Sequence, residues 1–198
     1  MATRDIIVMG ASAGGVEAYR EILRGLPSDL AASVFIVQHV GSRSVLADVL
    51  RWYAALQLAT AADGEGVRHV RVYVAPVGRR LLLERGRVRL SRAGRENNQR
   101  SSVDALFCSA AKAYRSRVIA VVLSEMLDDG AAGACAVKER GGLVIVQDPR
   151  TALYSPMPEN ALRAVQADYC VPLAEIAGLL VKLVREDSTL PALTAVEG

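Results

Sequence analysis

The sequence Ile-Ile-Val-Met-Gly-Ala-Ser-Ala-Gly-Gly occupies residues 6–15. Its first four residues form a continuous apolar run, which is typical of a strand buried on both faces. Small residues follow, and from residue 16 to residue 26 apolar side chains recur at helical spacing. The pattern predicts a strand, a tight turn and a helix, which is the repeating unit of α/β proteins.

The same alternation of apolar runs and helical patterns continues along the chain. It predicts further strands at 34–37, 70–75, 118–123, 143–146 and, at a sheet edge, 168–171. It predicts further helices at 45–56, 102–114, 130–140, 158–165 and 173–185. Two short runs, 81–84 and 87–91, flank Arg85-Gly86 and indicate an antiparallel β-hairpin. Because helices separate the other strands, we predict a three-layer, doubly wound α/β fold with a mostly parallel sheet.

The composition is that of a globular protein. Of the 198 residues, 52% are hydrophobic and the formal net charge is +3, so charge alone indicates neither disorder nor a polyanionic partner. The three cysteines are widely spaced and form no CxxC pair, which argues against a zinc site or a disulfide framework and favours a reducing cytoplasm. The amino terminus does not resemble a signal peptide, and no apolar run is long enough to span a membrane. We expect one domain over residues 1–187 and a flexible tail over 188–198.

Residues 10–14, Gly-Ala-Ser-Ala-Gly, match the G-x-S-x-G pattern between a strand and a helix. A nucleophilic serine needs such small neighbours because the turn that exposes its hydroxyl is tight. A glycine-rich loop at this place also binds the pyrophosphate of a dinucleotide, and a plain structural turn uses the same residues. A dinucleotide-binding fold places an acidic residue at the end of the second strand, where this chain has Gln38-His39. The phosphate-loop interpretation is therefore weakened.

A nucleophilic serine usually requires a histidine as general base, and the chain has two. His39 follows the second strand at its carboxyl end, which is the sheet edge that also carries Ser12. His69 precedes the next strand and is expected at the opposite edge. The alternative for His39 is a loop histidine with a single hydrogen bond, but its place near Ser12 favours the base.

The carboxylate that orients such a histidine is expected at the same edge. After the apolar run 118–123 the chain reads Ser-Glu-Met-Leu-Asp-Asp-Gly, which offers Asp129, Asp128 and Glu125. An aspartate here also has a structural interpretation, because it would cap the following helix. Candidate groups from three separate strands nevertheless meet at the carboxyl edge, where open α/β sheets hold their active sites.

Six segments carry a family resemblance. In chain order they are GASAGG, FIVQHV, VYVAP, SSVDALF, SEMLDDGAAG and YSPMPENA. In order and spacing they resemble the catalytic domain of the bacterial chemotaxis protein-glutamate methylesterases, the CheB family, over roughly residues 5–185. The resemblance implies a three-layer α/β domain that needs no metal and no organic cofactor.

The resemblance also implies roles for individual residues. It implies a catalytic triad of Ser12, His39 and Asp129, with backbone N–H groups of Ala13 and Met126 stabilising the oxyanion. The implied chemistry is hydrolysis of glutamate γ-methyl esters on methyl-accepting chemotaxis receptors or similar signalling proteins, and related enzymes also deamidate receptor glutamines. Neither nucleic acid nor membrane insertion is expected.

The sequence departs from the family pattern in the loop before Gly130. The family typically has T-G-M-G-x-D-G, whereas this chain has Glu125 and Leu127 in place of two glycines, and Ala13 in place of the usual threonine. Glycine permits backbone conformations that other residues resist, so the loop that presents Met126 is expected to differ. A catalytically inactive member that acts as a signalling binding module is therefore the alternative. The family's amino-terminal receiver domain does not precede the first strand, so regulation by phosphorylation within the chain is not expected.

Eight arginines lie between residues 79 and 100. Charged runs usually face water, so the first interpretation is a solvated hairpin. The alternative is a surface that docks acidic receptor helices. Few aromatic residues interleave with the arginines, which argues against a nucleic-acid module.

Overall fold

The computed structural model describes residues 3–12, 14–38, 45–92, 102–123 and 130–188. Its strands are β1 (Ile6–Ala11), β2 (Ser33–Gln38), β3 (Gln57–Thr60), β4 (Arg71–Val74), β5 (Arg79–Glu84), β6 (Arg87–Arg92), β7 (Val118–Val122), β8 (Leu143–Gln147) and β9 (Tyr169–Val171). Its α-helices are α1 (Gly15–Gly25), α2 (Leu46–Arg51), α3 (Ser102–Tyr114), α4 (Ala131–Glu139), α5 (Pro156–Ala164) and α6 (Leu173–Ser188). Two short 3₁₀ turns are η1 (Arg115–Arg117) and η2 (Pro149–Thr151).

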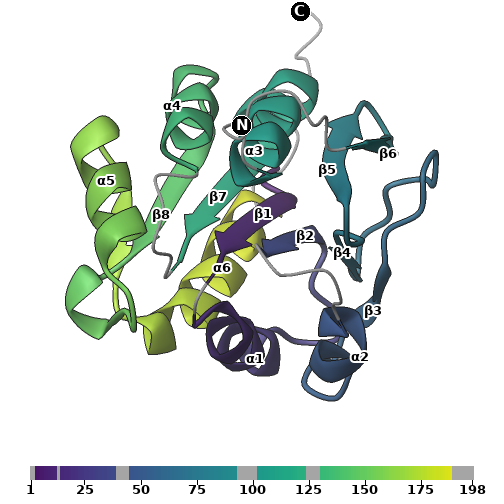
Figure 1. Cartoon of the computed structure of the whole chain (residues 1–198), viewed down its shortest axis with the longest axis horizontal. Helices are drawn as coiled ribbons and strands as arrows, with labels where there is room; N and C mark the ends of the chain where they lie inside the picture. The colour runs from purple at the N-terminus through teal and green to yellow at the C-terminus, as the bar shows by residue number, and fades with distance from the viewer. Residues whose placement is uncertain (1–2, 13, 39–44, 93–101, 124–129, 189–198) are drawn as a thin grey trace, which may run out of the picture.

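In the described part of the chain, seven strands form one sheet in the order β3-β4-β2-β1-β7-β8-β9, and each neighbouring pair is parallel. The other two strands, β5 and β6, form an antiparallel hairpin. Helices α1, α2 and α6 cover one face of the sheet, and α3, α4 and α5 cover the other (Figure 1). The predicted three-layer, doubly wound fold is confirmed.

The central strand β1 shows why both faces of the sheet are covered. All six of its residues are buried. Ile7 and Met9 belong to the core shared with α1, α2 and α6, whereas Ile6 and Val8 belong to the core on the other face. Side chains alternate between faces along a strand, so one continuous apolar run fills two cores. Burial of each such side chain contributes about 1.5–3 kcal/mol, so a polar substitution at any of the four is expected to destabilise the fold.

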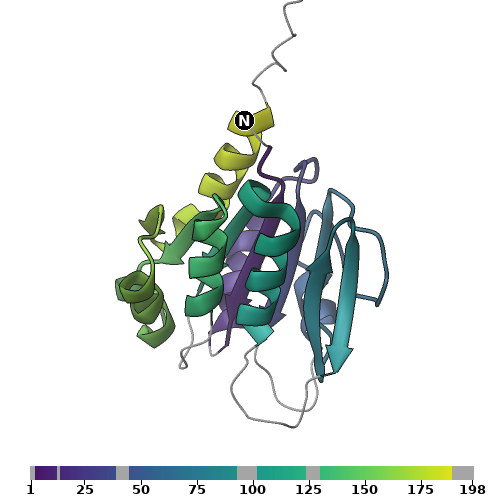
Figure 2. The same cartoon turned by 90° about the horizontal axis from the view of Figure 1, so that it is seen from above.

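The β5–β6 hairpin stands at one end of the molecule, packed against α3, and α5 lies at the other end (Figure 2). Its two-residue turn is Arg85-Gly86, and Gly86 has φ 77°, a left-handed conformation that glycine adopts without steric cost. Leu81, Leu83 and Val88 are buried in the core that includes α3. The predicted hairpin is therefore confirmed, with an apolar face that accounts for its packing.

The helix predicted over 45–56 is shorter in the structure. Helix α2 ends at Arg51, and Trp52 is 89% exposed. Residues 57–60 then form β3, an edge strand that pairs with β4 and that the periodicity did not indicate. The apolar residues after Arg51 continue the helical pattern in the sequence, but the chain leaves the helix there and enters β3 at Gln57.

The carboxyl-terminal helix α6 extends to Ser188, beyond the predicted end at residue 185. The division into a domain over 1–187 and a tail over 188–198 stays a prediction, because residues 189–198 lie outside the described part of the chain. Within the described ranges, no helix has both the length and the hydropathy needed to cross a membrane.

Candidate active site

Ser12 lies on a tight turn that joins the end of β1 to the start of α1. The backbone N–H of Gly15 donates to the carbonyl of Ser12 at 3.0 Å and closes the turn. Gly14, at the third position of this turn, has φ 79° and ψ −1°, in the left-handed region that glycine adopts without steric cost. Ser12 itself is half-buried. The turn thus carries a serine between a buried strand and a helix amino terminus, where developing negative charge is favoured.

Close packing around the turn explains why its neighbours are glycines. A Cβ on Gly10 would lie 2.3 Å from Cγ1 of Val103, at the start of α3. A Cβ on Gly15 would lie 2.7 Å from Cβ of Ala11. Neither distance is compatible with an undistorted side chain, so the small residues of the G-x-S-x-G region are required by packing as well as by the turn.

The register of the sheet brings three strand ends together beside Ser12. Gly10 pairs with Val37 of β2 on one side and with Val122 of β7 on the other. The N–H of Leu123 extends this alignment by donating to the carbonyl of Gly10 at 3.1 Å. The segments that follow β1, β2 and β7 therefore leave the sheet at one edge. They contain Ser12, the predicted base His39 and the predicted carboxylate Asp129.

This edge is also the place where the strand order reverses. From β1 the chain proceeds to β2 on one side and later to β7 on the other. Helix α1, which follows β1, covers one face of the sheet, and helix α3, which precedes β7, covers the other. In open α/β sheets the crevice outside such a reversal, at the carboxyl ends of the strands, is the usual ligand site.

The neighbour of the predicted base contacts the serine turn directly. Nε2 of Gln38, the last residue of β2, donates to the carbonyl oxygen of Ser12 at 3.3 Å. Oε1 of Gln38 is buried and has no hydrogen-bond partner among the described residues. If the side-chain amide of Gln38 were flipped, Oε1 would face the carbonyl oxygen of Ser12. The contact with Ser12 therefore fixes which end of the amide is the nitrogen. Local sequence patterns do not reveal this contact, because it joins the end of β2 to the turn that follows β1.

The residues that follow the segment predicted to carry Asp129 are held by close packing and by a hydrogen bond. Gly130 follows that segment with φ 99°, and a Cβ there would lie 2.8 Å from Cε of Met157 in α5 and 3.0 Å from Cγ1 of Val103. One turn later, the N–H of Gly133 donates to Oδ1 of Asp104 at 2.7 Å, which ties α4 to α3. The SSVDALF and YSPMPENA segments thus supply the residues that hold the start of α4.

Four of the five predicted site residues lie outside the described part of the chain. They are Ala13, His39, Met126 and Asp129. The departures at Glu125 and Leu127 lie there too. Their assignments stay predictions, and the described geometry places only Ser12 and the strand ends that lead to the others.

The second histidine lies at the opposite edge of the sheet. Nε2 of His69 is 2.8 Å from Oδ2 of Asp5, which directly precedes β1. Asp5 is only 3% exposed and also accepts hydrogen bonds from Nε and Nη2 of Arg117 at 2.8 and 2.7 Å. The hydrogen bond to Asp5 raises the pKa of the Arg117 guanidinium. The prediction that His69 is remote from Ser12 is confirmed, and a carboxylate that the sequence analysis did not single out holds it there.

The described residues offer neither a metal centre nor an activated thiol. Among them, no group of three or more histidine, cysteine, aspartate or glutamate side chains is placed to hold a metal ion. Cys108, Cys135 and Cys170 are free thiols. Burial raises the pKa of Cys108 and of Cys170, which disfavours the nucleophilic thiolate at both positions.

Comparison with known proteins agrees with this geometry. The CheB methylesterase family profile matches residues 7–180. A solved structure, the Thermotoga maritima CheB methylesterase catalytic domain, superposes with a TM-score of 0.84 at 34% sequence identity, covering 92% of this chain and 100% of that one.

Relatives of known sequence differ in how much of them the chain matches. A Leptospira interrogans protein is 38% identical over 182 residues, which cover 90% of this chain and 94% of the relative. A protein-glutamate methylesterase/protein-glutamine glutaminase from Moorella thermoacetica is 41% identical over 187 residues, but these cover only 44% of its length. The family profile, the identities and the solved structure agree, and the chain belongs to the CheB methylesterase family.

Proposed function

We propose that this chain hydrolyses the γ-methyl esters of glutamate side chains on proteins, with Ser12 as the nucleophile. The observation that carries the proposal is the position of Ser12 on a packed turn at the edge where β1, β2 and β7 end in register. Membership of the CheB family supports the same chemistry, because relatives such as the Moorella thermoacetica protein are protein-glutamate methylesterases.

In the proposed first step, the Oγ of Ser12 attacks the ester carbonyl while His39 takes the hydroxyl proton. The negative charge on the tetrahedral oxygen is stabilised by the backbone N–H groups of Ala13 and Met126, and one such donor lowers the barrier by about 3 kcal/mol. The C–O bond to the methoxy group then breaks, and the proton held by His39 passes to the leaving oxygen, which departs as methanol. Asp129 orients His39 and stabilises its charged form without taking the proton.

In the proposed second step, water resolves the acyl-enzyme. His39 takes one proton from the water as the water oxygen bonds to the acyl carbon, and the bond between the acyl carbon and the Oγ of Ser12 then breaks as His39 returns the proton to that Oγ. The products are a glutamate carboxylic acid and the free serine. A glutamine substrate would follow the same course with ammonia as the leaving group, which is the glutaminase activity in the names of the relatives.

We infer that the substrates are chemoreceptors or similar signalling proteins and that the chain acts in the cytoplasm. Support for this comes from the family alone. The chain needs no metal or organic cofactor in the proposed steps, because proton transfer and oxyanion stabilisation are supplied by side chains and backbone.

The test is methanol release from methylated chemoreceptor membranes. Wild type is expected to release methanol, and Ser12→Ala is expected to lose at least about 10³-fold in rate. Ser28→Ala, which changes an exposed serine outside the turn, is the matched control and should behave as wild type. Ammonia release from unmethylated receptors with glutamine at the same sites tests deamidation in parallel.

Absence of methanol and ammonia release by wild type, together with retained receptor binding, would instead support the inactive binding module. The altered residues Glu125 and Leu127 in the loop before Gly130 are what favours this second candidate. Restoring glycine at both positions would then be expected to restore turnover.

A further inference from the structure

A cleft of about 460 Å³ lies between the β5–β6 turn and the carboxyl-terminal half of α3 with η1. Among its described lining residues four are cationic, namely Arg85, Lys112, Arg115 and Arg117. Arg117 directly precedes β7 and bonds Asp5, which directly precedes β1. The cleft is therefore at the amino edge of the sheet, opposite the edge that carries Ser12, and it is separate from the candidate active site.

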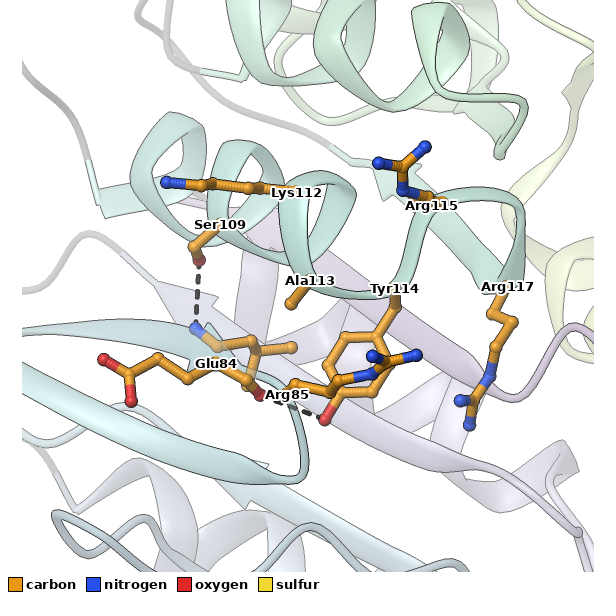
Figure 3. A pocket seen from close by; sticks show the side chains of 9 residues that line it. Glu84, Arg85, Ser109, Lys112, Ala113, Tyr114, Arg115 and Arg117 are labelled. Atoms are coloured by element: carbon orange, nitrogen blue, oxygen red, sulfur yellow. Dashed lines mark hydrogen bonds between the residues drawn. The ribbon is translucent and has the colours of Figure 1, made fainter.

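Hydrogen bonds hold the walls of the cleft in place (Figure 3). The N–H of Leu83 donates to Oγ of Ser109 at 3.0 Å. The hydroxyl of Tyr114 donates to the carbonyl of Glu84 at 3.2 Å and accepts from the N–H of Gly86 at 2.9 Å. The hairpin turn is thus fixed to α3 from both ends of the cleft, and the surface is formed before any partner arrives.

The charge of this cleft is not neutralised within the described residues. Elsewhere in the described chain arginines commonly face a carboxylate, as Arg71 faces Glu65 and Arg150 faces Asp148. In the cleft, Arg117 bonds Asp5, but the side chains of Arg85, Lys112 and Arg115 are exposed and make no ion pair or hydrogen bond with a described residue. Among the described lining residues the one carboxylate belongs to Glu84, and it faces Arg89 on the outer side of the hairpin.

The backbone at Arg115 adds a second observation. Arg115 directly follows the last residue of α3 and has φ 54°, in the left-handed region. Where a helix ends in this conformation, the residue is usually glycine. An arginine there is disfavoured by local sterics. The helix dipole favours cations at this end of α3, which accounts in part for Lys112 and Arg115. It does not account for Arg85, which reaches the same cleft from the hairpin.

We propose that this basic cleft docks an acidic segment of a partner protein. Figure 3 shows the cationic groups spread along the cleft, with Lys112 and Arg115 extending to different sides, rather than converging on one point. A single phosphate or sulfate needs convergent donors, whereas carboxylates spaced along a polypeptide match a row of separated cations. Because the cleft is opposite Ser12, a partner held there leaves the candidate active site uncovered.

The experiment measures binding of a fluorescein-labelled oligoglutamate peptide to the full chain by anisotropy at about 0.15 M salt. The cleft variant combines Arg85→Gln, Lys112→Gln and Arg115→Gln. The matched control combines Arg51→Gln, Arg163→Gln and Arg185→Gln, which removes the same charge from exposed positions elsewhere. The cleft variant is expected to raise Kd by about tenfold or more and the control by less than about twofold.

Equal weakening by the two triple variants would overturn the proposal, because it would indicate a response to net charge alone. So would the absence of measurable binding to wild type, or equal binding of an oligoglutamine peptide of the same length. Tighter binding of a single-stranded oligonucleotide, lost in the cleft variant, would assign the cleft to a nucleic acid and also overturn it. If the triple variant does not fold, Arg85→Gln alone, at the exposed turn, gives the same comparison with Arg51→Gln. Because the readout is binding, the result is independent of whether Ser12 is catalytic.

Discussion

The side-chain amide of Gln38 donates a hydrogen bond to the main-chain carbonyl of Ser12, with 3.3 Å between Nε2 and O. The bond links the end of β2 to the turn after β1, and the residue after Gln38 is the proposed base His39. It therefore restrains the nucleophile's backbone relative to the strand that delivers the base. Oε1 of Gln38 is buried and accepts no hydrogen bond from a described residue, which is the unfavourable part of this arrangement.

Replacement of Gln38 by methionine separates these two effects. The variant keeps the length of the side chain but loses both amide groups, so we expect kcat to fall about tenfold while KM changes less than about twofold. Loss of the buried acceptor offsets loss of the hydrogen bond, so the free energy of unfolding should fall by no more than about 1 kcal/mol. The measurements are steady-state kinetics, urea unfolding and the rate at which a fluorophosphonate labels Ser12. A drop in stability with an unchanged labelling rate would mean that Gln38 is only structural.

Gly10 is expected to tolerate no side chain while Val103 is present. Gly10→Ala would place Cβ 2.3 Å from Cγ1 of Val103, so we expect a loss of about 1–3 kcal/mol in the free energy of unfolding. Adding Val103→Ala should remove part of that loss, which a double-mutant cycle measures. Gly178→Ala is the control, because a Cβ there meets no atom within 4 Å, and it should stabilise α6 by about 0.5–1 kcal/mol. Strict additivity of the Gly10 and Val103 changes would show that the contact is not the cause.

The two histidines are expected to differ completely in their effect on catalysis. His69 contacts Asp5 at the edge opposite Ser12, so His69→Gln should keep activity within about twofold and lower stability by at most about 1 kcal/mol. His39→Gln should lower kcat by at least about 10³-fold, since it removes the proposed base. Assays of methanol release and urea unfolding on both variants make the comparison. A large loss of kcat in folded His69→Gln would contradict the assignment.

Asp148 gives a prediction about acid stability. The hydrogen bond from the side chain of Arg150 lowers the pKa of Asp148 below its ordinary value of 3.8, so the ionised form is favoured in the folded state. A lowered folded-state pKa stabilises the protein above the unfolded-state pKa, and this contribution disappears as pH falls through the folded-state value. Arg150→Gln should therefore unfold at lower urea concentration than wild type at pH 7, and the difference should shrink below about pH 4. A difference that persists unchanged at pH 3 would exclude this origin.

Glu125 is expected to affect the pH dependence of the proposed reaction. A carboxylate close to His39 would favour the protonated imidazole, which cannot act as a base. Glu125→Gly should then extend activity to lower pH by moving the acidic limb of the kcat/KM profile. Leu127→Gly, which restores the neighbouring glycine of the family pattern without changing charge, is the control. An acidic limb that moves equally in both variants, or in neither, would count against a role for the charge.

Local patterns predicted most of the fold, because strands and turns such as Ile6–Met9 and the glycines after it are determined by residues adjacent in the sequence. The edge strand β3 escaped prediction because its pairing with β4 is a tertiary preference. The contacts of Gln38 with Ser12 and of Arg117 with Asp5 escaped it for the same reason, since the latter pair is 112 residues apart. The resemblance indicated Ser12, His39 and Asp129 together, and the register of three strand ends is what now supports grouping them.

The position of β1 at the middle of the sheet also affects how the chain is made on the ribosome. One neighbour, β2, is synthesised soon after β1, but the other, β7, does not begin until Val118. At about 5–20 residues per second, a nascent chain spends roughly 4–16 seconds with one side of its future central strand unpaired. An apolar strand with an open edge is a template for aggregation. Translation speed between Gln38 and Val118 thus sets how long that edge is available, and fragments that stop before β7 should be the ones that require chaperones.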